Sequence, residues 1–358
     1  MPTASVLLIS AETLPNVLFI KEFPAERHVF ITTAKMEQEK RSEWIMRAAG
    51  IAPQKVQRIT VNQDDFGSIL QSLENAGLQP SADWQVNITG GNKLMSIAAF
   101  DFFARHEAAI FYLAVDNKHF QKLFPDSSLY PINYQVSLSE YLAAHGRVFK
   151  SMANPKLQDP LHLQESVTIM KECRRVNGIV GESLMLKEKI NTTKNLAEQQ
   201  VFYTGQWFEL YVYQTIKQHL KLSDAKIALS AALYPIDSDE EIQMNHNKDN
   251  DIDVCFVRNN YFYIMECKVY TSQTKAKNLQ QSKGVSSIHS HLYKLAAIKQ
   301  PLGLNAKAFL ITPNNLTANP TSFEAIKKRC ELLRINKPVD YQTLQTEQTF
   351  QKFLLEKF

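Results

Sequence analysis

The chain has 358 residues, of which 44% are hydrophobic and 21% charged. This length and composition indicate a globular protein of about two domains rather than a disordered one. No apolar run approaches the ~20 residues of a membrane-spanning helix, and the formal net charge of +4 by itself excludes no class of partner.

The first apolar run, Ser5–Ile9, has no basic segment before it and is soon followed by Glu12. It therefore predicts a first strand and not a signal peptide. The four cysteines show no Cys-x-x-Cys spacing, so we expect neither a disulfide framework nor a zinc site. We therefore expect the protein to be cytoplasmic, where thiols stay reduced.

Residues 1 to about 116 alternate between strand-like and helical patterns. The expected strands are Ser5–Ser10, His28–Thr32, Arg58–Val61, Gln85–Thr89 and Ala109–Val115. The expected helices are Leu14–Glu22, Met36–Ala49, Phe66–Ala76 and Asn92–Ala104. A further strand and a short helix within 134–146 are expected to close this domain, which we place at 1–148. The pattern predicts a mostly parallel sheet that binds ligands at the carboxyl ends of its strands.

The segment Thr89-Gly90-Gly91-Asn92-Lys93 follows one of these strands and opens a helix. Two glycines allow a sharp turn with bare N–H groups, Asn92 is a plausible N-cap, and Lys93 adds a full positive charge to the helix N-terminus. These features favour an anion site, although a plain Gly-Gly connection remains open. A second loop, with Ser10, Glu12 and Asn16, follows the first strand and should open on the same edge.

A linker is expected at 149–165, which is polar and contains Pro155 and Pro160, and a second domain at 166–358. Its beginning is rich in helical patterns. From Ala225 the expected order is strand, acidic loop, hairpin, long helix, strand and helix. The acidic cluster at 237–241 reads as a solvated loop.

The hairpin carries the strongest chemical signal. Two runs rich in Val, Ile, Phe and Tyr are joined by Asn259-Asn260, which suits a two-residue turn. In that register Asp253 faces Glu266, with Lys268 on the same face, and directly opposed side chains have Cβ atoms about 5 Å apart. A divalent cation relieves the repulsion of two such carboxylates. A three-residue turn would move Asp253 to the other face, and an exposed Glu-x-Lys strand is the ordinary alternative.

We expect Asp253, Glu266 and the carbonyl of Cys267 to hold Mg²⁺ or Mn²⁺, with Lys268 as the catalytic cation. Glu209 shares a helical face with apolar residues, so it needs a buried partner; a metal or a salt bridge would serve. After the hairpin no Asp or Glu occurs until Glu324, and the interval is lysine-rich. It is either a phosphate-attracting surface or a solvated helix face.

Taken together, these motifs resemble a known family. Asn87-Ile88-Thr89-Gly90-Gly91-Asn92-Lys93-Leu94-Met95 is similar to the signature loop of CARF domains that are fused to a PD-(D/E)xK nuclease. The first loop, the stretch Gly205–Glu209, Asn250–Asp253 and Glu266-Cys267-Lys268 resemble other parts of that family in the same order. The resemblance covers nearly the whole chain. Asn92 is a departure, because many members carry Thr there.

The resemblance implies an α/β protein with an N-terminal Rossmann-like CARF domain and a C-terminal restriction-endonuclease-like domain. It implies a homodimer that binds cyclic tetra-adenylate through loop residues Ser10, Glu12, Asn16, Thr89, Gly90, Gly91, Asn92 and Lys93. It also implies a metal-dependent nuclease that cuts DNA, and in some members RNA, in type III CRISPR antiviral defence, with Glu209 linked to the metal. The alternatives are an unregulated restriction- or repair-type nuclease and a ligand-sensing regulator that binds nucleic acid without cutting it.

Overall fold

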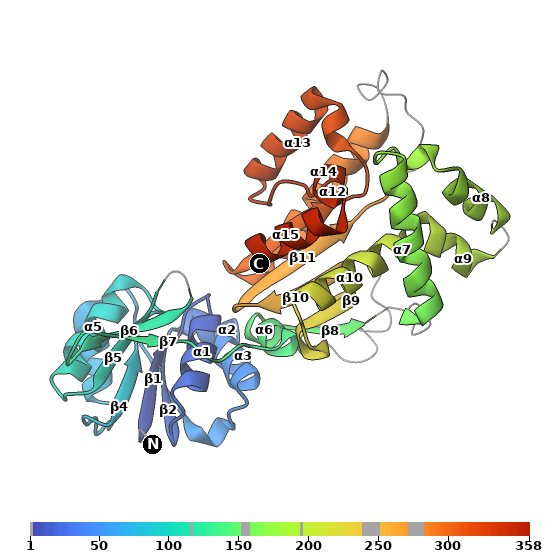
Figure 1. Ribbon diagram of the computed structural model, residues 1–358. Helices are drawn as coiled ribbons and strands as arrows, with labels where there is room; N and C mark the ends of the chain where they lie inside the picture. The colour runs from blue at the N-terminus through green and yellow to red at the C-terminus, as the bar shows by residue number, and fades with distance from the viewer. Residues whose placement is uncertain (1–2, 115–116, 152–157, 194–195, 238–250, 271–282) are drawn as a thin grey trace. The chain divides into compact units, whose positions relative to one another are not determined.

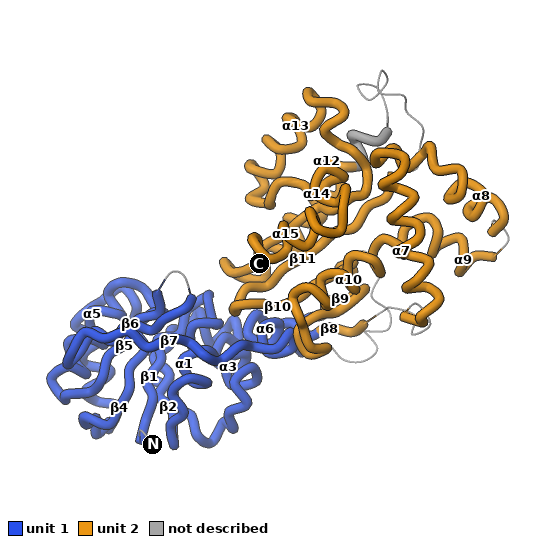
Figure 2. Tube along the Cα trace, in the orientation of Figure 1, with its two compact units in different colours: residues 1–148, 235–238 blue, residues 149–234, 239–358 orange. Residues whose placement is uncertain are grey.

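The computed structural model describes residues 3–114, 117–151, 158–193, 196–237, 251–270 and 283–358 (Figure 1). The chain forms two compact units, shown in Figure 2. The first comprises Met1–Val148 with Pro235–Ser238, and the second comprises Phe149–Tyr234 with Asp239–Phe358. Among the described helices, none has the length and apolar character needed to cross a bilayer.

The first unit is built on a seven-stranded sheet with the order β3-β2-β1-β4-β5-β6-β7. Its strands are β1 Ala4–Leu8, β2 Arg27–Thr32, β3 Val56–Thr60, β4 Trp84–Asn87, β5 Ala109–Leu113, β6 His119–Phe124 and β7 Ser128–Pro131. The first five pair in parallel, which confirms the predicted α/β sheet, whereas β6 and β7 pair antiparallel. The helices are α1 Leu14–Glu22, α2 Ala34–Gln38, α3 Arg41–Ala49, α4 Phe66–Glu74, α5 Lys93–Ala104 and α6 Leu138–Ala144.

Two sequence expectations for this unit were wrong. The single helix expected at Met36–Ala49 is two helices, because Lys40 adopts a left-handed conformation with φ of 58° and ends α2. The strand expected within 134–146 is absent. That region contains α6, which starts with a capping box between Ser137 and Glu140, and the additional strands lie earlier, in the β6–β7 hairpin.

The second unit is built on a five-stranded sheet with the order β12-β11-β10-β9-β8. Its strands are β8 Arg147–Ser151, β9 Ile227–Pro235, β10 Asp251–Arg258, β11 Tyr261–Cys267 and β12 Ala306–Ile311. β9, β10 and β11 pair antiparallel, and β12 adds in parallel to β11. The range expected to be a linker thus contains most of β8, and α7 already begins at Pro160.

Helices pack around this second sheet. They are α7 Pro160–Arg175, α8 Leu184–Thr192, α9 Ala197–Val201, α10 Trp207–His219, α12 Lys283–Lys299, α13 Pro320–Leu332, α14 Tyr341–Leu344 and α15 Glu347–Lys357. α10 packs against β10 and β11, and α12 packs against β11 and β12. Consequently both helices that carry polar residues of interest, α10 and α12, are anchored to the strands of the predicted hairpin.

Candidate active site and ligand-sensing loop

The β10–β11 hairpin has the register that the sequence predicts. Arg258 pairs with Tyr261 and Val254 with Met265. Asn259 and Asn260 form the turn with φ values of 52° and 60°, the left-handed pair that a tight type I′ turn requires. The regular ladder ends at Val254, and the polar residues Asp253 and Glu266 follow just beyond it.

The structure brings Asp253, Glu266 and Lys268 together. The Lys268 ammonium donates hydrogen bonds to Asp253 Oδ2 at 2.9 Å and to the Cys267 carbonyl at 3.0 Å, and it lies 2.9 Å from Glu266 Oε1. The Cys267 amide also donates to Asp253 Oδ2, at 2.7 Å. A single cation thus neutralises two carboxylates that face each other across the hairpin.

Burial of this cluster shifts the pKa values of its charged groups. The Glu266 side chain is 1% exposed, and neither of its oxygens accepts a hydrogen bond from a described residue. Burial and the charge of Glu266 raise the pKa of Asp253. Burial alone would lower the pKa of Lys268, but the negative charges of Asp253 and Glu266 have the larger effect and raise that pKa. An additional cation would therefore be stabilised beside these carboxylates.

Glu209 lies in the first turn of α10 and belongs to the same electrostatic cluster. Burial, followed by the charge of Asp253, raises the pKa of Glu209 to about 8, and a hydrogen bond with the Ser230 side chain opposes the rise. Ser230 lies within β9 and has a φ of 50°. The helical spacing of Glu209 predicted that its side chain points inward, and in the structure it is close enough to the hairpin to be affected by the charges of Asp253 and Lys268.

Sequence reasoning did not place two further residues at this site. His291 Nδ1 lies 3.8 Å and Lys294 Nζ 4.0 Å from Glu266 Oε1, both from α12. Burial, with Lys268 and Lys294 nearby, lowers the pKa of His291 to about 4. The basic composition after the hairpin was the available signal, but composition cannot tell which lysines face the carboxylates. Lys275 and Lys277 of that interval lie outside the described residues.

In the first unit, Gly90 and Gly91 have backbone roles. A Cβ on Gly90 would overlap the carbonyl oxygen of Leu8, and Gly91 has a φ of 72°. Asn92 caps α5 by accepting from the Met95 amide at 2.9 Å. These contacts place the loop directly against the end of β1.

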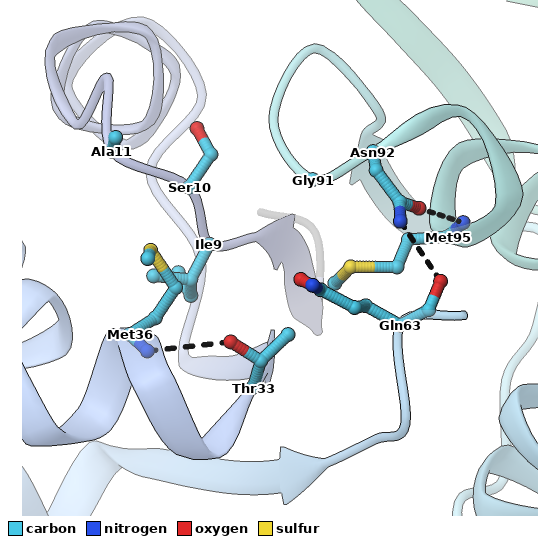
Figure 3. Close-up of a pocket in the computed structure, with 9 residues that line it drawn as sticks. All are labelled: Ile9, Ser10, Ala11, Thr33, Met36, Gln63, Gly91, Asn92 and Met95. Atoms are coloured by element: carbon cyan, nitrogen blue, oxygen red, sulfur yellow. Dashed lines mark hydrogen bonds between the residues drawn. The ribbon is translucent and has the colours of Figure 1, made fainter.

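A hollow of about 180 Å³ opens at this loop (Figure 3). Of the predicted ligand-binding residues, Ser10, Gly91 and Asn92 line it; the others on its wall are Ile9, Ala11, Thr33, Met36, Gln63 and Met95. Sequence reasoning missed Thr33, Met36 and Gln63, which follow the ends of β2 and β3. Because parallel strands end at one edge of a sheet, their position after those strands was a usable signal.

The remaining predicted residues do not line the hollow. Asn16 is buried and donates to the Leu8 carbonyl at 2.9 Å, and Asn87 donates to Asn16 at 2.9 Å. Thr89 accepts from the Leu113 amide at 2.7 Å. Glu12 is half-buried, and Lys93 is exposed at the start of α5. Asn16 and Thr89 therefore hold the strand ends together.

Comparison with known families decides the identity of both units. Residues 4–141 match the family described as the Card1 CARF domain, and residues 197–339 match the Card1-like endonuclease domain. The chain belongs to the Card1-like CARF-domain endonucleases. The CARF domain contains the hollow at the Gly-Gly loop, and the endonuclease domain contains the hairpin cluster.

Solved structures share this two-domain fold. Can2 from Sulfobacillus thermosulfidooxidans, in complex with cyclic tetra-adenylate, aligns with a TM-score of 0.67 and 21% identity over 98% of this chain and 99% of that one. Protein VC1899 from Vibrio cholerae aligns with a TM-score of 0.70 and 16% identity over 98% of each chain. No protein with a curated description matches the chain.

The donor set of the endonuclease domain fits a hard divalent cation. Asp253, Glu266 and the Cys267 carbonyl offer oxygen ligands, and both Glu266 oxygens are buried without a hydrogen bond from a described residue. Within the described ranges, no three His, Cys, Asp or Glu side chains converge closely enough to enclose a metal. The Lys268 ammonium lies between Asp253 and Glu266 instead.

Proposed function

We propose that this protein is a metal-dependent nuclease that cuts DNA, with RNA as a second substrate, and that cyclic tetra-adenylate activates it in type III CRISPR antiviral defence. The observation that carries the proposal is the convergence of Asp253, Glu266 and Lys268 at the end of one hairpin. We propose a sensing domain at 1–148 and a nuclease domain at 166–358, joined by the segment 149–165, which contains most of β8 and the start of α7.

In this proposal Asp253, Glu266 and the Cys267 carbonyl hold Mg²⁺ or Mn²⁺, and Glu209 supports the same group from α10. A bound divalent cation supplies a Lewis acid that stabilises negative charge on a phosphoryl oxygen. Lys268 then either orients the attacking water or stabilises, through its ammonium, the charge that develops at the phosphate. The backbone of Cys267 keeps Asp253 in place through its amide.

The sensing half of the proposal rests on the Gly-Gly loop. The hollow of about 180 Å³ is smaller than the ~300–1,000 Å³ of pockets for drug-sized ligands. One CARF domain therefore offers room for only part of a cyclic oligonucleotide, which favours a homodimer that completes the site. Cyclic tetra-adenylate is the ligand in the Sulfobacillus Can2 complex, and we propose the same activator here. Ser10, Gly91 and Asn92 would contact it directly.

The deciding experiment crosses activators with substrates. Purified protein is incubated with supercoiled plasmid DNA or with RNA, in Mg²⁺, Mn²⁺ or EDTA, and with cyclic tri-, tetra- or hexa-adenylate. We expect cleavage only with a divalent metal and strongest with the tetra-adenylate. Equal cleavage with and without every activator would leave an unregulated nuclease. Salt-sensitive binding without cleavage in any metal would leave a nucleic-acid-binding regulator.

A further inference from the structure

Helix α12 places two additional basic side chains, His291 and Lys294, near the Glu266 carboxylate. His291 and Lys294 are three residues apart and therefore share one helical face. Their nitrogens lie 3.8 Å and 4.0 Å from Glu266 Oε1. The same oxygen lies 2.9 Å from Lys268 Nζ, so basic side chains approach it both from α12 and from the end of β11.

The direction of Lys294 is set by core packing. α12 buries Ile288, Leu292, Leu295 and Ile298, a stripe at helical spacing. The helix packs with these residues against β11 and β12. Lys294 therefore points toward the carboxylates because the core holds α12 in this register, and a weak ion pair with Glu266 is not needed to hold it there.

The contact with Glu266 does not satisfy the Lys294 ammonium. A separation of 4.0 Å is too long for a hydrogen bond. An ammonium has three donors, and within the described parts of the chain none of them forms a hydrogen bond. The side chain is 35% exposed. Lys294 can therefore reach an anion that approaches from solvent while its charge stays beside the carboxylates.

Charge balance indicates which ligand this arrangement takes. Asp253 and Glu266 carry two negative charges, and Lys268 and Lys294 carry two positive ones. A divalent cation on the same carboxylates adds two positive charges, and one excess positive charge remains even when Glu209 is ionised. A phosphodiester is an anion that matches this excess, and lysine binds phosphate well as a point charge.

We propose that Lys294 contacts a non-bridging oxygen of the phosphodiester to be cut and positions it beside Glu266. This inference rests on the nuclease function proposed above. Lys294 is accordingly a substrate-positioning residue: it acts through its charge, and arginine can replace it. The reaction itself depends on the hairpin residues.

The test measures binding and turnover separately. Binding of a fluorescein-labelled single-stranded oligodeoxynucleotide is followed by anisotropy in Ca²⁺ with cyclic tetra-adenylate, over a series of KCl concentrations, because the excess positive charge requires a divalent cation on the carboxylates. Cleavage of the same strand is measured in Mn²⁺. Each variant, Lys294→Ala, Lys294→Gln and Lys294→Arg, is compared with Lys328→Ala, a change of an exposed lysine on α13. Thermal melting confirms that each variant is folded.

For Lys294→Ala and Lys294→Gln we expect the slope of log K against log[salt] to fall by about 0.7, the value for one phosphate contact on a single strand. We expect KM to rise about tenfold while kcat changes less than threefold; Lys294→Arg and Lys328→Ala should match the wild type. A wild-type slope and KM in Lys294→Ala would overturn the inference, as would failure of arginine to rescue. If the wild-type protein cuts no nucleic acid in any metal, the proposed function fails instead.

Discussion

The Lys268 ammonium lies 2.9 Å from Asp253 Oδ2, on an oxygen that a divalent cation would also need. The lysine and a metal ion therefore compete for the same carboxylate. Replacing Lys268 with Ala removes the positive charge that lies between the two carboxylates, so we expect Mn²⁺ affinity to rise about fivefold, close to 1 kcal/mol. Calorimetric titration of the full-length variant measures this, with Lys328→Ala as the control. Weaker Mn²⁺ binding in the variant would show that Lys268 does not compete with the metal ion for Asp253.

Neutral isosteres of the two strand carboxylates test the active site directly. Asp253→Asn and Glu266→Gln keep size and burial but remove the charge that holds a cation. We expect nuclease activity to fall at least about 100-fold in each, within the range for loss of a central catalytic group. Initial cleavage rates measure the effect. Glu331→Gln, at an exposed position on α13, is the matched control. Wild-type rates in both site variants would remove these carboxylates from the mechanism.

The close approach of Gly90 to Leu8 gives a prediction for the sensing loop. In Gly90→Ala the new Cβ overlaps the Leu8 carbonyl oxygen, so the loop must shift away from β1. We expect cyclic tetra-adenylate to bind at least about tenfold more weakly, a difference of ~1.4 kcal/mol, by calorimetry. Gly67→Ala is the control, because its Cβ makes only an ordinary 3.5 Å contact with Asp65 Oδ1. Unchanged affinity in Gly90→Ala would place the ligand elsewhere.

Glu140 predicts a pH dependence of CARF-domain stability. Burial opposes ionisation of Glu140, but the Ser137 amide, the Tyr134 hydroxyl and the Lys21 ammonium together lower its pKa to about 2. Because this folded-state pKa is below the unfolded value near ~4.3, its contribution is complete above that value and is lost as pH falls toward 2. We expect Glu140→Gln to lower Tm at pH 7, and the difference to shrink between about pH 4.5 and 2. A constant difference would show that the contribution of Glu140 is not ionic.

Phe358 anchors α15 to the endonuclease sheet. It is buried and contacts the rings of Phe256, Tyr263, Phe309 and Phe353, and its main-chain oxygen accepts a hydrogen bond from the Asn259 side chain at 3.1 Å. Phe358→Ala should lower the free energy of unfolding of this domain by about 3 kcal/mol, as expected for a buried ring. Urea denaturation measures the loss, and Leu355→Ala, at a position that is 54% exposed, should be near neutral. Equal losses of unfolding free energy in Phe358→Ala and Leu355→Ala would show that the ring contacts of Phe358 do not stabilise the domain.

The sequence by itself determined the features that short-range rules govern. A two-residue Asn-Asn turn permits one hairpin register, and that register carries Asp253 and Glu266 to the same edge. The alternation of strands and helices likewise predicted the parallel sheet. Asn92 was recognisable as an N-cap because its side chain serves the helix that directly follows it.

Only the tertiary structure decided which distant residues join these features. Local patterns did not reveal the left-handed Lys40 that divides one expected helix or the antiparallel β6–β7 strands, and composition could not select Lys294 from a lysine-rich interval. The position of Lys294 depends on how the apolar stripe of α12 packs onto β11 and β12. Such packing is a sum of many weak contacts between segments far apart in the chain, and no short stretch of sequence contains it.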